Sequence, residues 1–460
     1  MSVMRSWASG SGRPWPAFAG ALTVTLVLTA GPARACDPEQ HRHAAAAAAA
    51  GGHAHHRDEG ASKNVKLVGT VPDAKGAISV NFLTYDDGRD VMLVSGTFGL
   101  KAYDVADPAQ PKPIGAFTLP NMWETENTEV DPERKLVFLA RDPRAFGGNT
   151  DTGESGVYTV DASDPTKLRQ LSYVKVPSGH TTSCVNKCRY LWTGGPSKAK
   201  NMPADWGGRP IWVTDMRDPA KPTVYPDPID LNRNDGKTDY VHDVQLDAAG
   251  VAWVSGRGGV RGYWTEGEHA DPVTGKTRTA TASDPVPYAG GGIAETAAPS
   301  RFMHNSFRPT GNRRGDGGSA RDDLLYITEE SFVSGCAGDG VLVIASIAGS
   351  EKGQAWKSTP QQPYRLTTVG TWSVAGQDGT DKNSADCSAH YFDISGKILA
   401  QSFYAQGTRF LDISDPSNPR QVAYHRPGDA ASWAPFWHKG LAYVADNKRG
   451  VDVLKLEGVE

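Results

Sequence analysis

The feature that most constrains the fold is a short phrase that returns four times along the chain. Each copy is a strand-like run that ends in Asp, then two residues, Asp-Pro, and a second strand-like run. The copies are LKAYDVADPAQPKPIGAF from Leu100, VYTVDASDPTKLRQLSYV from Val157, IWVTDMRDPAKPTVYPD from Ile211 and TRFLDISDPSNPRQVAYH from Thr408. Asp side chains accept hydrogen bonds from nearby backbone amides, and Pro cannot extend a strand ladder. The phrase DxxDP therefore predicts a tight corner between adjacent antiparallel strands.

A further pair of strands precedes each corner, as in DVMLVSGTFGL, KLVFLARD, RYLWTGG and ILAQSFYAQG. Four strands per unit, recurring about every 45 to 85 residues, is typical of the blades of a β-propeller. The sequence predicts an all-β fold, a single seven-bladed propeller of four-stranded antiparallel blades over residues 63–460. The seven units begin near Ile78, Glu126, His180, His242, His304, His390 and Ser432.

The last unit lacks an outer strand, because the sequence ends soon after GVDVLKLEG. At the other end, NVKLVGTV (64–71) resembles the strand that follows DxxDP in the complete units. We expect this N-terminal strand to close the last blade, which would remove two exposed sheet edges. A closed ring has no free edge that demands association, so we also expect a monomer.

Histidine occupies the same position in four consecutive units. Aligning HDVQLDAAGVAWVSG with ENTEVDPERKLVFLA places His242 on Glu126, and the same alignment adds His180, His304 and His390. The first strand of each blade lines the central channel, so equivalent residues converge on one axis. Neutral imidazole is a common ligand of Cu, Fe and Zn. The predicted metal site therefore comprises the four histidines and Glu126, which is also the candidate general base.

A simpler interpretation stays open, because channel mouths are polar and wet. The four histidines could hydrogen-bond to one another, to Glu126 or to water without any metal. If a metal binds, Asp243, Asn305 and Glu126 are candidates to hold the free imidazole nitrogens. We place His438 in a turn, outside the ring.

The N-terminus has the features of an export signal. Arg5 and Arg13 precede or flank an apolar run (17–29), and Ala33-Arg34-Ala35 fits the small-x-small cleavage pattern. We predict a signal peptide over residues 1–35 and a secreted or extracytoplasmic protein. The run is shorter than the roughly 20 residues of a membrane span, and no later segment is long enough. A lipid anchor at Cys36, which would tether the chain to the cell surface, is an alternative.

Residues 36–62 are rich in Ala and His and predict a disordered linker, since such a tract cannot bury a core. Its histidines could still collect metal loosely; they are His41, His43, His53, His55 and His56. Loss of the signal peptide would remove three arginines and no acid, taking the net charge from −4 to −7. With no basic face evident, we expect no nucleic acid partner.

The chain has five cysteines, and export implies an oxidising compartment. Cys184 and Cys188 bracket a possible turn, VNK, so we favour a bond between them. Cys336 and Cys387 would then form the second bond and leave Cys36 over. The other two pairings of these four cysteines remain open.

Phrases such as GLKAYDVADPAQPKPIG and GTRFLDISDPSNPRQVAY resemble the LVIVD repeat of exported and cell-surface bacterial β-propellers. The resemblance covers most of residues 63–460. Units four and five depart from it, because they lack DxxDP and carry inserts at 266–300 and 311–322. The resemblance implies the propeller architecture and little chemistry, since that family is defined by its repeat and most members have no assigned activity.

The sequence contains no GxSxG elbow, HExxH motif, phosphate loop or dinucleotide fingerprint, so we expect no nucleotide cofactor. On the resemblance, we expect mainly a binding or surface-interaction protein for a small molecule or a cell-surface protein or glycan. The alternative is a Cu- or Fe-dependent oxidoreductase with the metal on the four channel histidines. Whether the chain is an enzyme stays open at this point.

Overall fold

The computed structural model describes most of the compact unit Cys36–Glu460. The described residues are 60–119, 126–142, 155–195, 210–230, 241–256, 259–271, 274–288, 302–309, 323–331, 333–336, 340–347 and 366–459. The predicted signal peptide, which is the separate unit Met1–Ala35, lies outside them. So do Cys36, the five tail histidines and most of the predicted inserts.

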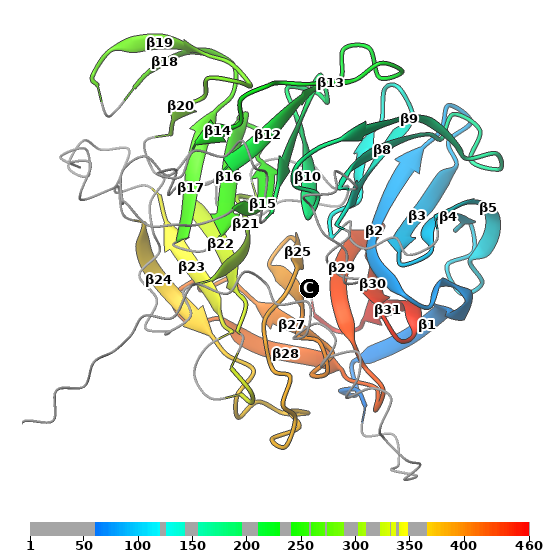
Figure 1. Cartoon of the computed structure of the whole chain (residues 1–460). Coiled ribbons are helices and arrows are strands. Elements are labelled where there is room, and N and C mark those ends of the chain that lie inside the picture. Colours follow the sequence, from blue (N-terminus) through cyan, green and yellow to red (C-terminus); the bar gives the residue numbers. More distant parts are fainter. Residues whose placement is uncertain are drawn as a thin grey trace, which may run out of the picture. The chain divides into compact units, whose positions relative to one another are not determined.

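Seven antiparallel sheets follow one another in chain order around a common centre, which confirms the predicted seven-bladed β-propeller (Figure 1). Within a blade, the strands pair in chain order from the centre outward, except that the outer strand of the last blade comes from the N-terminal end of the described chain. The first three blades are β2 (Ala77–Thr84), β3 (Asp90–Gly96), β4 (Gly99–Asp104) and β5 (Lys112–Thr118); β6 (Glu129–Asp131), β7 (Leu136–Arg141), β8 (Gly156–Asp161) and β9 (Arg169–Lys175); and β10 (Thr181–Val185), β11 (Tyr190–Gly194), β12 (Pro210–Asp215) and β13 (Thr223–Val224).

The remaining four blades repeat this order. They are β15 (Val241–Leu246), β16 (Val251–Gly256), β17 (Gly259–Trp264) and β20 (Val286–Pro287); β21 (Met303–Phe307), β22 (Leu324–Glu329), β23 (Leu342–Ser346) and β24 (Thr367–Trp372); β25 (Phe392–Ser395), β26 (Ile398–Ser402), β27 (Thr408–Asp412) and β28 (Arg420–His425); and β29 (Ser432–His438), β30 (Leu441–Asp446), β31 (Gly450–Leu456) and β1 (Val65–Val71).

Four smaller elements complete the described fold. In blade 3, β14 (Ile229–Asp230) adds a second short partner to β12. In blade 4, β18 (Gly267–Ala270) and β19 (Thr277–Ala280) form a two-stranded ribbon within the predicted insert. A single 3₁₀ turn, η1 (Pro72–Ala74), follows β1. Across the described ranges, no helix has the length and apolar character needed to cross a membrane.

The N-terminal strand closes the ring, as predicted. β1 pairs antiparallel with β31, from Val65 opposite Leu456 to Val71 opposite Val451. Ahead of it, Ala61 bridges His425 in blade 6. The chain therefore joins the propeller slightly before residue 63.

The DxxDP corners adopt the turn chemistry that their sequence predicts. In the first, Asp104 accepts a hydrogen bond from the amide of Ala106 at 2.8 Å, and Asp107 accepts one from Ala109 at 3.0 Å. The same pair of turns recurs in the other three copies. Each corner connects the third and fourth strands of its blade.

These corners also contact the preceding blade. In blade 1, a Cβ on Gly115 of β5 would overlap the carbonyl oxygen of Pro165, which lies in the corner of blade 2. In blade 2, Ser172 of β9 instead donates a hydrogen bond at 2.7 Å to the carbonyl of Pro219 in blade 3. The Asp-Pro corner thus shapes the interface between blades as well as the turn.

The hydrophobic core is divided among the blade interfaces. Seven clusters of buried apolar side chains each join two neighbouring blades, and the last of them joins blade 7 to blade 1. At this closing interface, Val80 and Met92 pack with Phe436 and Val453. Burying one large apolar side chain stabilises a fold by about 1.5–3 kcal/mol. Most of this stabilisation therefore acts between neighbouring blades.

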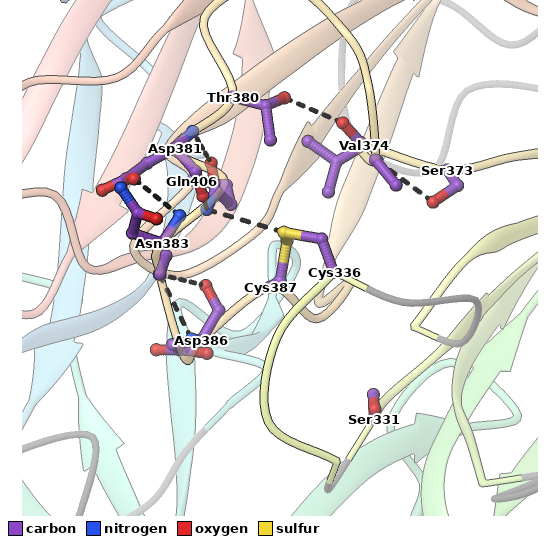
Figure 2. The surroundings of a disulfide bond; sticks show 12 residues. Ser331, Cys336, Ser373, Val374, Thr380, Asp381, Asn383, Asp386, Cys387 and Gln406 are labelled. Atoms are coloured by element: carbon purple, nitrogen blue, oxygen red, sulfur yellow. Dashed lines mark hydrogen bonds between the residues drawn. A yellow bond between two sulfur atoms is a disulfide. The ribbon is translucent and has the colours of Figure 1, made fainter.

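Both favoured disulfides are present, Cys184–Cys188 and Cys336–Cys387. The first closes the hairpin between β10 and β11. The second joins the connection after β22 to the segment that leads into β25, and Figure 2 shows Gln406 beside it. The Gln406 amide lies 3.9 Å from the Cys336 sulfur and bonds the backbone of Asp381.

The prediction that His438 lies in a turn was wrong. His438 is the last residue of β29, where it pairs with Leu441. Its ring stacks on Phe82 at 3.9 Å between centroids, and its Nε2 lies 3.0 Å from a carboxylate oxygen of Asp90. β29 has seven residues, and the contacts with blade 1 hold its last residue in the strand.

Candidate metal centre

Four blades place the residue at the ring position in a β-bulge, three of them at the predicted residue. The pairing register of the first strand skips one residue there, and the skipped residues are Ile78, His242, His304 and Trp433. In blade 7 the ring position is therefore Trp433, one residue after the predicted Ser432. A bulge leaves one residue out of the ladder and re-aims its side chain, a common device next to functional sites.

The ring-position side chains contact one another from blade to blade. The centroid distances are 4.5 Å from His180 to His242, 4.2 Å from His242 to His304, and 3.9 Å from His304 to His390. His390 then lies 5.0 Å from Trp433. The four histidines form a continuous arc along blades 3 to 6, as the repeat register predicts.

Glu126 of blade 2 lies at the focus of this arc. Its Oε2 is 3.2 Å from Nε2 of His242, 3.3 Å from Nε2 of His304 and 3.7 Å from Nε2 of His180. Its Oε1 is 3.5 Å from Nε2 of His390. All five side chains are at most 3% exposed. The structure thus brings every predicted site residue together, in a cluster that could hold a metal ion.

The other ring nitrogen of three histidines faces an acceptor. Nδ1 of His242 lies 2.9 Å from the carbonyl oxygen of His304, and Nδ1 of His390 lies 2.7 Å from that of Trp433. Nδ1 of His180 lies 3.2 Å from a carboxylate oxygen of Asp142. Since a carbonyl can only accept, we assign the proton to Nδ1, which leaves the Nε2 lone pair facing Glu126. Metal-binding histidines are commonly held in this way.

The predicted supporting residues Asp243 and Asn305 point elsewhere. Asp243 accepts a hydrogen bond from Gln245 at 2.9 Å, and Asn305 accepts one from Thr328 at 2.5 Å. Asp142, which supports His180, was missed because it lies at the end of the neighbouring blade's second strand. Only the packing of blade 2 against blade 3 brings Asp142 to that ring.

The nitrogen positions provide a test of fit to a metal. Nε2 of His180 and Nε2 of His242 are 2.8 Å apart. Two bonds of about 2.1 Å at roughly 85° to each other would give this separation. Nε2 of His390 and both ring nitrogens of His304 make no well-formed hydrogen bond with the described residues. A shared cation would accept the two lone pairs that face each other and would give the buried nitrogens a partner.

Burial controls the charge of the cluster. It lowers the pKa of His242 well below 6.5 and that of His304 to about 3, so both rings are neutral near pH 7. Burial also acts to raise the pKa of Glu126, but the surrounding histidines outweigh it and hold that pKa well below 4.5. His390 differs, because the hydrogen bond and charge of Glu126 outweigh burial and raise its pKa above 6.5. Neutral His242 and His304 beside an ionised Glu126 are in the protonation states that a metal ion requires.

A second buried carboxylate, Glu330, lies beside the arc and was not found from the sequence. One of its oxygens lies within 4.8 Å of ligand nitrogens of His242 and His304. Tyr404 donates a hydrogen bond to Glu330 at 2.7 Å. Burial raises the pKa of Glu330 to about 7. Neither residue lies at the repeat position, so the alignment of the blades gave no signal for them.

Aromatic and aliphatic side chains complete the surroundings. Tyr391 donates a hydrogen bond to Glu126 at 3.3 Å. Ile78, Tyr404 and Trp433 form a separate buried cluster on the side of blades 6, 7 and 1. The ring is therefore polar over blades 2 to 6 and apolar where the chain closes.

No protein-family model matches the chain, and no curated protein matches it. Solved structures resemble it to different degrees. The β-propeller domain of Myceliophteria thermophila Cps50 (Swd1) has a TM-score of 0.51 at 10% identity, covering 85% of this chain and 99% of that one. Periplasmic gluconolactonase PpgL of Pseudomonas aeruginosa has a TM-score of 0.45 at 12% identity, covering 76% and 86%. At such identities the similarity to Cps50 shows the fold alone.

Proposed function

We propose that this chain is an exported propeller of the LVIVD-repeat type that binds one first-row transition-metal ion at its axis. The observation that carries the proposal is the approach of four imidazole Nε2 atoms to the single carboxylate of Glu126, within 3.2–3.7 Å. A donor set rich in imidazole suits Cu, Fe or Zn rather than Mg or Ca.

In this proposal His180, His242, His304 and His390 are the ligands. Glu126 is a fifth ligand or the neighbouring counter-charge. Both of its oxygens lie among the Nε2 atoms, which favours these roles over that of general base. Four neutral imidazoles and one carboxylate would leave a divalent ion with a single net charge, which lowers the cost of burying it.

A metal-dependent oxidoreductase is the second candidate function. The observation that favours it is the set of buried groups that can carry protons beside the histidines, namely Glu330, Tyr404 and Tyr391. A bound Cu or Fe ion would supply Lewis-acid or one-electron chemistry, and these side chains could hold or move protons. Interaction with a cell-surface protein or glycan rests on the repeat resemblance.

Metal analysis of the full-length chain tests the proposal, with the five tail histidines replaced by alanine so that they bind nothing. We expect about one ion per chain, lost in His242→Ala. His269→Ala is the control. His269 lies in the ribbon of blade 4, away from the axis, and stacks on Trp264 of β17. The proposal fails if no stoichiometric metal is found and His242→Ala changes neither metal content nor stability.

Asp142→Asn tests how the ligands are held. The variant keeps the size of the side chain but weakens its hold on His180 Nδ1. We expect metal affinity to fall by about 10- to 100-fold, as is usual for groups that orient a ligating histidine. Competition with a chelator of known affinity measures this change. An affinity within twofold of the parent would argue against His180 as a ligand.

A further inference from the structure

Glu330 is held in place by the chain on both sides of the histidines. Its backbone amide donates to the carbonyl of Phe302 at 2.9 Å, in the segment that enters β21 and carries His304. The amide of the next residue, Ser331, donates to the Ser388 hydroxyl at 2.7 Å, two residues before His390. The Glu330 carboxylate is therefore fixed between two of the proposed ligands.

Tyr404, which donates to Glu330, is itself held in an unusual conformation. Its φ is +46°, in the left-handed region that bulky residues rarely adopt. Its amide donates to the carbonyl of Ser432 at 3.0 Å, and the amide of Ser432 donates to the carbonyl of Tyr404 at 3.0 Å. Strained backbone that the surroundings enforce is found mainly at functional sites.

The loop that follows Tyr404 is also held in place, by hydrogen bonds and a disulfide. Gln406 bonds the amide and the carbonyl of Asp381, each at 2.9 Å, and the Cys336–Cys387 disulfide lies against it, as Figure 2 shows. The same disulfide ties the segment after Glu330 to the segment before His390. Two hydrogen bonds and a disulfide thus fix where the Tyr404 hydroxyl and the Glu330 carboxylate meet.

We propose that Glu330, positioned by Tyr404, contacts the small molecule that shares this site with the metal, and that it selects neutral molecules carrying an O–H group. The inference rests on the proposed metal-binding function. A carboxylate can accept a hydrogen bond from water, an alcohol or a hydroperoxide, whereas it repels an anion at the same place. Glu330 lies close enough to His242 and His304 to act on anything bound between them.

Cobalt(II) and azide provide the test. The full-length chain with its tail histidines replaced is loaded with cobalt(II), whose visible spectrum reports coordination. It is then titrated with azide at about pH 8.5, where Glu330 is ionised although burial raises its pKa to about 7. Glu330→Gln removes the negative charge and keeps the shape. We expect it to bind azide at least about tenfold more tightly than the parent, because the repulsion of the buried charge is gone. Tyr404→Phe should shift azide affinity at least about threefold.

Glu329→Gln is the matched control, because it changes a buried carboxyl group one residue earlier, at the end of β22, that is in none of the groups that could hold a metal ion among the described residues. Its azide affinity should stay within twofold of the parent. The inference is overturned if Glu330→Gln holds one cobalt per chain and its azide affinity is unchanged, or if Glu330→Gln loses the cobalt. Failure of the parent to bind cobalt would instead overturn the proposed function, and this inference with it.

Discussion

One charged residue, Asp90, joins blade 1 to blade 7 where the ring closes. Asp90 of blade 1 accepts a hydrogen bond from Thr84 at 2.7 Å and meets Lys439 of blade 7 at 2.5 Å and His438 at 3.0 Å. Burial acts to raise the pKa of Asp90, but Lys439, Thr84 and His438 together outweigh it and lower that pKa below 3.8. Asp90 therefore favours the folded state whenever it is ionised.

This shift predicts a pH-dependent effect of Asp90→Asn. Because the folded pKa is lowered, the contribution is present above about pH 4 and is lost as the pH falls through the folded value. We expect the variant to lose roughly 1–2 kcal/mol of unfolding free energy at pH 7, and much less at pH 3. Urea unfolding at both pH values measures the difference. Asp87→Asn, in an exposed pair with Arg89, is the control and should have no measurable effect. An equal loss at pH 7 and pH 3 would contradict the assignment.

At the scale of elements, the Asp-Pro corner determines how one blade meets the next. The outer strands of three blades have glycine where the Pro carbonyl of a neighbouring corner approaches, at Gly69, Gly115 and Gly370. The conformational freedom of glycine is not needed there, since none of the three has a positive φ. Glycine is required because no side chain fits.

Gly115→Ala should therefore destabilise the fold. Its Cβ would overlap the backbone of Pro165, which cannot move without shifting blade 2. We expect a loss of about 1–3 kcal/mol in unfolding free energy, as is usual for overpacking. Gly428→Ala is the control, because nothing lies within 4 Å of a Cβ at that position and its φ is not positive. Equal midpoints of denaturant unfolding for the two variants would contradict this view of the corner.

For the whole molecule, closure of the ring depends on β1, which supplies the outer strand of blade 7. Without it, β31 would become an exposed edge, and Val71, which is 2% exposed, would leave the core between blades 7 and 1. The last blade is thus assembled from the two ends of the described chain.

Deletion of residues 60–71 should open the ring. We expect a loss of at least about 3 kcal/mol, because the deletion removes buried Val71, the half-buried Val65 and Val68, and the strand ladder with β31. Hydrogen exchange should become faster in β31 before it does so in blades 3 to 5. Thermal unfolding and exchange measured by mass spectrometry report both changes. Deletion of residues 41–56 is the control and should leave the midpoint unchanged; a similar effect of both deletions would contradict the role of β1.

Much of the site was predictable because the blades repeat. One alignment identified Glu126 and the four histidines, since equivalent positions in a closed ring must meet at the axis. The same alignment misplaced the position in blade 7 by one residue, since the bulged residue that matches His242 and His304 there is Trp433 and not Ser432. Asp142, Glu330 and Tyr404 lie at strand ends or in connections, where no repeat marks them.

The sequence by itself determined the elements that depend on local chemistry: alternating strands, Asp-Pro corners, seven units and the histidine at one position in four of them. The tertiary structure decided which nitrogens face Glu126, which groups hold the opposite nitrogens, and that Glu330 and Tyr404 share the site. The physical reason is that strand and turn preferences act between neighbours in sequence. The contacts within the site instead join residues as far apart in sequence as Glu126 and Tyr391. They exist only once all the blades have packed into a ring.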